Sequence, residues 1–229
     1  MKLSLYEHSN DLRKRFIVII LSLFIFFIVG FYFSNFFIKR IIDDLIFIEN
    51  IRIIGLTPVE YILTQVKVGF IVSLIMSLPV IIYELLAFVK PGLREKERKL
   101  IGLILPMFIV LFLMGIVFAY FIFLPVAIYF LANLSAGIIE NIWSINRFVN
   151  LVLVSCLSFG VMFQLPLVLL VLSRFNLVNR KKLKKYRAHV YVALFLVAAA
   201  ITPPDFITQL IIALPLILLY ELSLFIVKN

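Results

Sequence analysis

Six apolar runs, most of them long enough to cross a bilayer, constrain this chain more than any other feature. An α-helix rises about 1.5 Å per residue, so roughly 20 apolar residues span the ~30 Å hydrocarbon core. With 64% hydrophobic and 15% charged residues, the 229-residue chain has too little polar surface for a water-soluble fold. An all-α integral membrane protein is therefore predicted, with six transmembrane helices at about 16–38, 66–89, 101–124, 148–172, 188–201 and 206–227.

The distribution of basic residues predicts how these spans are oriented. One side of the predicted topology carries 17 of the 22 Lys and Arg residues, and seven of them lie between Arg174 and Arg187. Because basic loops remain in the cytoplasm, both termini are predicted to be cytoplasmic, with the more acidic loops outside. The first run has no small-residue cleavage site, so we expect a retained span rather than a signal peptide.

The last two spans are predicted to be short. The run 188–201 supplies only 14 residues, or roughly 21 Å of helix. The sixth run is interrupted by Gln209, Pro215 and Glu221. Such a hairpin is expected to thin the bilayer locally or to tuck against longer helices.

A short interfacial helix is predicted before the second span. Thr57 can cap it, Pro58 occupies the first helical position, and Glu60 follows Thr57 by three residues. Nearby, Lys67 could neutralise either Glu60 or a lipid phosphate. At the opposite ends of their spans, Glu84 and Glu221 are expected to reach the interface, and neither is assigned a function.

Four sequence blocks stand at the span ends and loops. The longest, SLPVIIYELLAFVKPGL, covers 77–93 and is followed by Glu97 and Arg98. The others are HSNDLRKR at 8–15, FGVMFQLP at 159–166, and TPPD at 202–205, which Gln209 follows. In this order and at these positions, the blocks resemble TatC, the multi-spanning subunit of the twin-arginine protein translocase.

The resemblance implies a single membrane domain over 1–229, built as a concave helical bundle that acts as a receptor and scaffold rather than as an enzyme. A TatC-type subunit binds twin-arginine signal peptides of folded precursor proteins at the cytoplasmic face. It self-associates, assembles with TatA- and TatB-type single-span proteins, and supports export driven by the proton-motive force. The implied location is the cytoplasmic (inner) membrane of a bacterium or archaeon rather than an organellar membrane.

Asp11 and Glu97 are the candidate acceptors for the two signal arginines, because a carboxylate can bind a guanidinium through paired hydrogen bonds. The matching blocks add Arg13 and Arg98 to the expected signal-peptide-binding set. Two alternatives stay open. Asp11, where the family usually has glutamate, could cap the first helix, and Glu97 could pair with Arg94 or Arg98 on its own loop.

Gln164 lies in mid-span, where an uncharged amide needs a hydrogen bond. TatC often has glutamate here, so a mechanism that requires a carboxylate at this depth is not expected. Gln164 and Tyr120 are predicted to dock the helix of a partner, and a helix-to-helix hydrogen bond within the subunit is the alternative for Gln164. Pro166 is expected to loosen the helical hydrogen-bond ladder.

The outer turn of the last hairpin is expected to be structural, with Asp205 capping a helix. Its predicted residues are Pro203, Pro204, Asp205 and Gln209.

No metal or cofactor is predicted, because Cys156 is the single cysteine and the two histidines stand alone in the sequence. The net charge of +10 is attributed to loop orientation and membrane lipid rather than to nucleic acid. A small-molecule secondary transporter is the alternative function. It is weakened by the absence of a visible internal repeat and by the scarcity of ionisable groups in mid-span.

Overall fold

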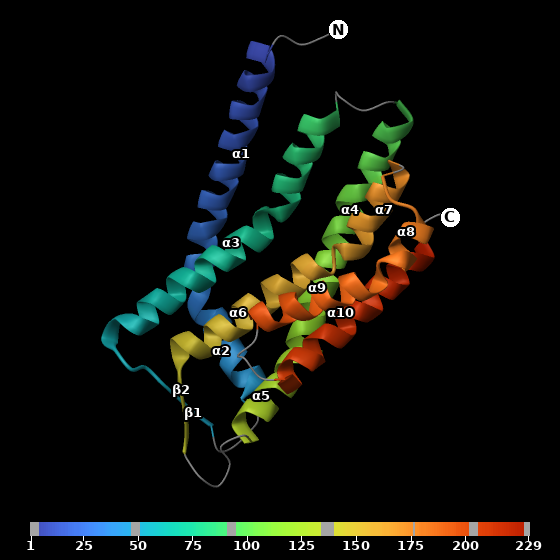
Figure 1. Cartoon of the computed structure of the whole chain (residues 1–229). Helices are drawn as coiled ribbons and strands as arrows, with labels where there is room; N and C mark the ends of the chain where they lie inside the picture. The colour runs from blue at the N-terminus through green and yellow to red at the C-terminus, as the bar shows by residue number, and fades with distance from the viewer. Residues whose placement is uncertain are drawn as a thin grey trace. The chain divides into compact units, whose positions relative to one another are not determined.

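The computed structural model describes residues 5–46, 51–90, 95–133, 140–175, 177–201 and 206–226, with side chains over slightly narrower ranges. Within these ranges the fold is helical apart from two short strands (Figure 1), which confirms the predicted all-α class. The chain divides into two compact units. The first contains 1–109 and 142–150, and the second contains 110–141 and 151–229.

In the first unit, α1 (Leu5–Tyr32) and α3 (Pro58–Val89) lie side by side and antiparallel (Figure 1). Their backbones touch where two glycines meet. A Cβ added at Gly30 would lie 2.8 Å from the carbonyl oxygen of Gly69, and one added at Gly69 would lie 3.0 Å from the amide nitrogen of Phe31. Only residues without a side chain permit this approach, as at other close crossings of membrane helices.

A separate helix, α2 (Ser34–Leu45), follows α1 and packs on α3. It buries four residues at helical spacing, so one face is covered and the other is polar. These residues are Ser34, Ile38, Ile41 and Leu45. After α2, β1 (Ile51–Ile54) pairs with β2 (Asn141–Ser144) in a two-stranded sheet. Neither α2 as a separate helix nor this sheet was predicted, because hydropathy merges α2 with the first span.

The predicted short interfacial helix is wrong, because α3 runs for 32 residues from Pro58 without a break. Its start nevertheless has the expected chemistry: Thr57 is the extended N-cap residue and Pro58 is at the first helical position. Thr57 makes no side-chain capping hydrogen bond, and the carboxylate of Glu60 instead accepts from the N–H of Leu56 at 2.5 Å.

Glu60 also joins the start of α3 to the segment after β2. Its side chain is buried, and its carboxylate accepts hydrogen bonds from the hydroxyl of Ser144 and from the N–H of Asn146, the latter at 3.3 Å. Lys67 donates to the Oδ1 of Asn146 at 2.8 Å. From the sequence, Lys67 has two candidate partners, Glu60 and a lipid phosphate. In the structure Lys67 bonds to a third group, a side-chain amide that lies 79 residues away in sequence.

In the second unit, the helical run that starts as α4 (Glu95–Phe118) widens into a π-helical turn, η2 (Ala119–Phe123), and continues as α5 (Leu124–Asn133). The N–H of Leu124 bonds to the carbonyl of Ala119, five residues back. Pro125 follows and has no N–H to donate to the preceding turn, which accounts for the local widening. The run therefore extends about nine residues beyond the predicted span.

The next span is split into α6 (Ile145–Met162) and α7 (Leu165–Arg174). Pro166 cannot donate to the carbonyl of Met162, and the N–H of Gln164 bonds to Val161, three residues back, at 3.0 Å. The expected loosening of the ladder at Pro166 is thus confirmed, because a turn at Phe163 and Gln164 separates α6 from α7.

Tight packing beside this break forms the core of the second unit. A Cβ added at Gly115 would lie 2.5 Å from the carbonyl oxygen of Phe159, so α4 and α6 cross with their backbones in contact. The buried ring of Phe159 lies 5.4 Å from that of Phe118 and 5.0 Å from that of Phe123, measured between centroids. Such aromatic clusters contribute both buried area and favourable ring geometry.

The chain ends with α8 (Arg180–Lys185), α9 (Arg187–Ile201) and α10 (Phe206–Ile226). At 15 residues, α9 is short, as predicted, and α10 packs on α7, α8 and α9. The side-chain amide of Gln209 donates to the carbonyl of Phe195 at 3.0 Å and so links α9 to α10. The predicted turn residues Pro203, Pro204 and Asp205 lie outside the described residues.

Four helical runs in the described chain are long and apolar enough to cross a membrane, and two shorter apolar helices follow them. The four are Asp11–Tyr32, Pro58–Val89, Gly102–Asn133 and Ile145–Arg174, and the shorter two are Arg187–Ala199 and Gln209–Phe225. Each of the six predicted runs overlaps one of these helices, while the number of complete spans and the side of the termini remain predictions.

Replacing Gly30 with alanine should push α1 away from α3. We expect Gly30→Ala to lower the free energy of unfolding by about 1–3 kcal/mol, the usual cost of overpacking. The measurement is the thermal midpoint in detergent, taken as the fraction of folded protein on gel filtration after heating. Gly102→Ala is the control, since nothing lies within 4 Å of a Cβ added there. Equal midpoints for both variants would contradict a close crossing.

Replacing Glu60 with glutamine should loosen the contact between α3 and β2. The amide would present N–H groups to donors, so we expect a loss of about 1–3 kcal/mol. Limited trypsin digestion reports this locally, because Arg52 and Arg147 flank the contact: cleavage there should be faster in Glu60→Gln. Glu140→Gln, at an exposed carboxylate, should leave cleavage unchanged. Unaltered cleavage in Glu60→Gln would count against the anchoring role.

Candidate functional site

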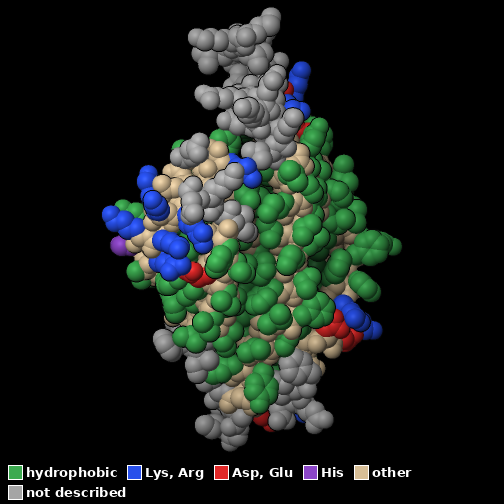
Figure 2. Space-filling model, turned by 90° about the vertical axis from the view of Figure 1, so that its right-hand side faces the viewer, with side chains coloured by type: hydrophobic (Ala, Val, Ile, Leu, Met, Phe, Trp, Pro, Cys, Tyr) green, Lys and Arg blue, Asp and Glu red, His purple; other side chains and the backbone are tan. Residues whose placement is uncertain are grey.

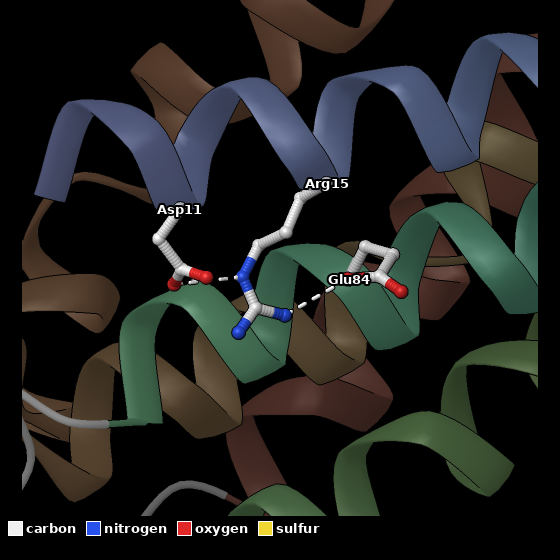
Figure 3. Close-up of polar contacts among 3 residues, drawn as sticks. All are labelled: Asp11, Arg15 and Glu84. Atoms are coloured by element: carbon white, nitrogen blue, oxygen red, sulfur yellow. Dashed lines mark hydrogen bonds and ion pairs between the residues drawn. The ribbon is translucent and has the colours of Figure 1, made fainter. Parts of the chain in front are cut away.

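A charged cluster joins α1 to α3 near the amino-terminal end of α1 (Figure 3). Asp11 and Arg15 are four residues apart on α1, so they share one helix face. That face meets α3 near its carboxyl end, where Glu84 lies. The three side chains converge although Glu84 is 69 residues from Arg15 in sequence.

Arg15 lies between the two carboxylates. Its Nε donates to the Oδ2 of Asp11 at 3.1 Å, and its Nη1 donates to the Oε2 of Glu84 at 2.8 Å. Exposure decreases across the cluster: the Asp11 side chain is 46% exposed, that of Arg15 23% and that of Glu84 15%. The Arg15–Glu84 pair is therefore the shielded part, and Asp11 is the part that a ligand can reach.

The cluster carries two negative charges and one positive charge. Arg15 engages one oxygen of each carboxylate, so Oδ1 of Asp11 takes no hydrogen bond from it. A guanidinium held between two carboxylates is restricted in its rotation, and it in turn fixes the plane of each carboxylate. The arrangement can thus present a fixed, half-exposed carboxylate with a net negative surrounding to a cationic ligand.

The residues predicted to bind the signal peptide differ in how far the structure describes them. Asp11 cannot be the helix cap that remained an alternative, because α1 begins at Leu5, six residues earlier. Arg13 lies on the same helix and is exposed. Glu97 and Arg98 belong to the first turns of α4, but their side chains lie outside the described residues.

Glu84 and Glu221, which were expected to reach the interface and were assigned no function, both have partners within the chain. Glu84 binds Arg15, while Glu221 accepts from Arg187 at 2.7 Å and from the hydroxyl of Tyr191. A carboxylate at a span end, on the same predicted side as an excess of arginines, is the signal that could have found these pairs. Hydropathy does not show which arginine each carboxylate binds.

The residues predicted to dock a partner helix differ in how accessible they are. Gln164 is 7% exposed, precedes α7, and donates to the carbonyl of Gly160 at 3.5 Å. This bond joins residues four apart in one helical run, so the helix-to-helix hydrogen bond that was the alternative stays a prediction. Tyr120 lies in the π-helical turn with its ring edge-on to Phe121, whose side chain is largely exposed.

No metal site is evident among the described residues, since no group of three or more His, Cys, Asp or Glu side chains could hold an ion there. Cys156 is buried and carries a free thiol.

Comparison with known proteins agrees with the order of the sequence motifs. The family model for Sec-independent protein translocase protein (TatC) matches residues 7–215. The chain is 33% identical over 227 residues to TatC of Carboxydothermus hydrogenoformans, with 99% of this chain and 93% of that protein covered. It is 35% identical over 229 residues to TatCy of Bacillus subtilis, with 99% and 89% covered.

Solved structures show the same relationship in three dimensions. A crystal structure of the twin-arginine translocase receptor TatC superimposes with a TM-score of 0.83 at 32% identity, covering 96% of this chain and 97% of that one. A second crystal structure of the same receptor, in DDM, gives a TM-score of 0.87 at 33% identity, covering 97% and 100%. The chain therefore belongs to the TatC family of Sec-independent protein translocase proteins, and it is a multi-pass membrane subunit of the twin-arginine translocation type.

Proposed function

We propose that this subunit is the receptor for twin-arginine signal peptides, and that Asp11 and Glu97 accept the two signal arginines at the cytoplasmic face. The observation that carries the proposal is the half-exposed carboxylate of Asp11, which Arg15 holds in place. Two crystal structures to which this chain is similar are of a translocase receptor, which supports the same role.

The charge of the cluster favours a guanidinium ligand. Asp11 and Glu84 together outweigh Arg15 by one negative charge, so an additional cation is attracted. An incoming arginine can bind the oxygen of Asp11 that Arg15 leaves open, or replace the single bond from Arg15 with a paired one. Each charge-assisted hydrogen bond contributes about 1.5–3 kcal/mol, and lysine cannot reproduce the planar fork of donors. Two such contacts would distinguish Arg-Arg from Lys-Lys.

The remaining proposed residues extend this surface. Arg13 and Arg98 are assigned to the signal-peptide site by their positions in the family blocks. The exposed position of Arg13, two residues from Asp11, is compatible with contact to the bound peptide. Glu97 stands in the first turn of α4, where its carboxylate would supply the second arginine contact.

Assembly is the second half of the proposal. The subunit would self-associate in one membrane domain, bind TatA- and TatB-type single-span proteins, and export folded precursors by using the proton-motive force. Tyr120, with the exposed Phe121 beside it, is the accessible part of the proposed docking surface, and the buried Gln164 is the second residue proposed for it. The turn at Pro203, Pro204, Asp205 and Gln209 retains its proposed structural role.

Photo-crosslinking tests the arginine contacts directly. A probe at Leu12, whose side chain is exposed beside Asp11, should crosslink an Arg-Arg signal peptide to lipid-reconstituted protein more strongly than a Lys-Lys peptide. Asp11→Asn should weaken the Arg-Arg affinity about tenfold or more, the equivalent of one charge-assisted bond. Asp11→Glu should preserve binding, because it restores the residue usual in the family.

Asp43→Asn, at an exposed carboxylate on α2, is the matched control and should leave the affinity unchanged. Equal crosslinking of the Arg-Arg and Lys-Lys peptides would overturn the proposed pocket, as would equal effects of the substitutions at Asp11 and Asp43.

The shielded half of the cluster should contribute to stability. Glu84→Gln leaves Arg15 with one charged partner, and we expect it to lower the free energy of unfolding by about 1–2 kcal/mol. Arg40→Gln breaks the pair with Asp44, in which the arginine side chain is 67% exposed, and should cost no more than about 0.5 kcal/mol. Thermal midpoints in detergent compare the two variants. Identical shifts would show that the Arg15–Glu84 pair behaves as a solvated surface pair.

A further inference from the structure

The connection between α7 and α9 carries many cations and little counter-charge. Seven Lys and Arg residues lie in the basic segment, Arg174–Arg187, and no Asp or Glu occurs anywhere from 141 to 204. Helix α8 itself reads Arg-Lys-Lys-Leu-Lys-Lys. Of these side chains, Arg187 has a carboxylate partner, Glu221. The basic segment is therefore a concentrated positive charge on the surface of the second unit, and Figure 2 shows such Lys and Arg side chains gathered beside hydrophobic surface.

Helix α10, which packs against α8, has an exposed apolar stripe on its surface. Leu214, Leu218, Leu222 and Phe225 are all exposed, and their spacing of four, four and three residues places them on one helix face. A continuous row of leucines that no part of the described chain covers is the surface that lipid acyl chains contact in a membrane protein. The stripe ends at Phe225, close to the last described residue of α10.

Arg180 lies at the Phe225 end of this stripe. The central carbon of its guanidinium is 5.5 Å from the centroid of the Phe225 ring, within the range of a cation–π contact. Among the described ion pairs none includes Arg180, and its Nε has no hydrogen-bond partner in the described chain. Within the described chain this guanidinium thus contacts an aromatic ring but forms no ion pair. Its charge is left for a ligand from outside the chain to neutralise.

The position of Arg180 is set by contacts between α8 and α10. The hydroxyl of Tyr220, a buried residue of α10, donates to the carbonyl of Leu183 in α8 at 2.9 Å. One turn away, Arg187 binds Glu221. These bonds hold the basic segment against the same helix that carries the apolar stripe, so charge and stripe belong to one surface.

We propose that Arg180, Phe225 and the apolar stripe of α10 form a binding site for one anionic phospholipid of the adjoining leaflet. The phosphate binds the guanidinium of Arg180, and an acyl chain lies along Leu222 and Leu218. The exposed lysines of α8 select a headgroup with net negative charge, because they repel the ammonium of a zwitterionic lipid while attracting anionic headgroups to the surface. The site does not depend on signal-peptide binding.

Native mass spectrometry of the full chain in detergent tests the proposal, with phosphatidylglycerol and phosphatidylcholine of identical acyl chains titrated in parallel. We expect the phosphatidylglycerol adduct to exceed the phosphatidylcholine adduct about tenfold. Arg180→Gln should lower the phosphatidylglycerol adduct to the phosphatidylcholine level. Arg147→Gln makes the same change of charge at an exposed arginine of α6, outside the basic segment, and should alter the adduct by no more than about twofold.

Two further arms locate the interaction. Arg180→Lys keeps the charge without the planar fork and should give an intermediate adduct; it also serves if Arg180→Gln fails to elute as folded protein on gel filtration. Glycerol phosphate, the headgroup without chains, should not displace the lipid at a hundredfold excess. Equal binding of the two lipids, equal losses in Arg180→Gln and Arg147→Gln, or displacement by glycerol phosphate would each overturn a phospholipid site at Arg180.

Discussion

The close approach of α1 and α3 at Gly30 and Gly69 is the constraint on which the first unit depends. Because the two helices are antiparallel, residues equally far from the crossing on the two helices are placed at the same level. Arg15 lies 15 residues before Gly30, and Glu84 lies 15 residues after Gly69. The glycine contact thus sets the register that brings the arginine to its carboxylate, about 22 Å along the helices. A bulkier residue at the crossing would disturb the charged cluster from a distance.

The low dielectric of the membrane explains which carboxylate is available for recognition. Charged groups near a bilayer are costly unless they find partners, and the described acids that are most shielded have found them within the chain. Glu60 is bound by Ser144, Leu56 and Asn146, Glu84 by Arg15, and Glu221 by Arg187 and Tyr191. Asp11 shares its partner with Glu84 and stays half-exposed. Asp11 is therefore the carboxylate of this cluster that a cationic ligand can reach.

In the second unit, the strongly cationic basic segment is held against apolar helices. Tyr220 and Glu221, adjacent on α10, bind α8 and α9 respectively, so one turn of α10 secures the carboxyl-terminal part of the basic segment. Pro125 and Pro166 interrupt the helical ladders elsewhere in the unit, and backbone contact at Gly115 compensates with tight packing around Phe159. A fixed Arg180 at the end of a lipid-facing stripe follows from this arrangement.

The sequence by itself determined the solvent, the helical class, six apolar segments and the family, because hydropathy, helix length and motif order are all local properties of the chain. It also located Asp11, the start of α3 at Pro58 and the break at Pro166, where a single residue type dictates the backbone. Only the tertiary structure decided that Arg15 meets Glu84, that Glu60 meets Ser144 and that Arg180 meets Phe225. These partners are far apart in sequence, 69 residues in the first case and 84 in the second. Their pairing depends on the register and crossing of packed helices, which apolar surfaces of similar composition do not encode locally.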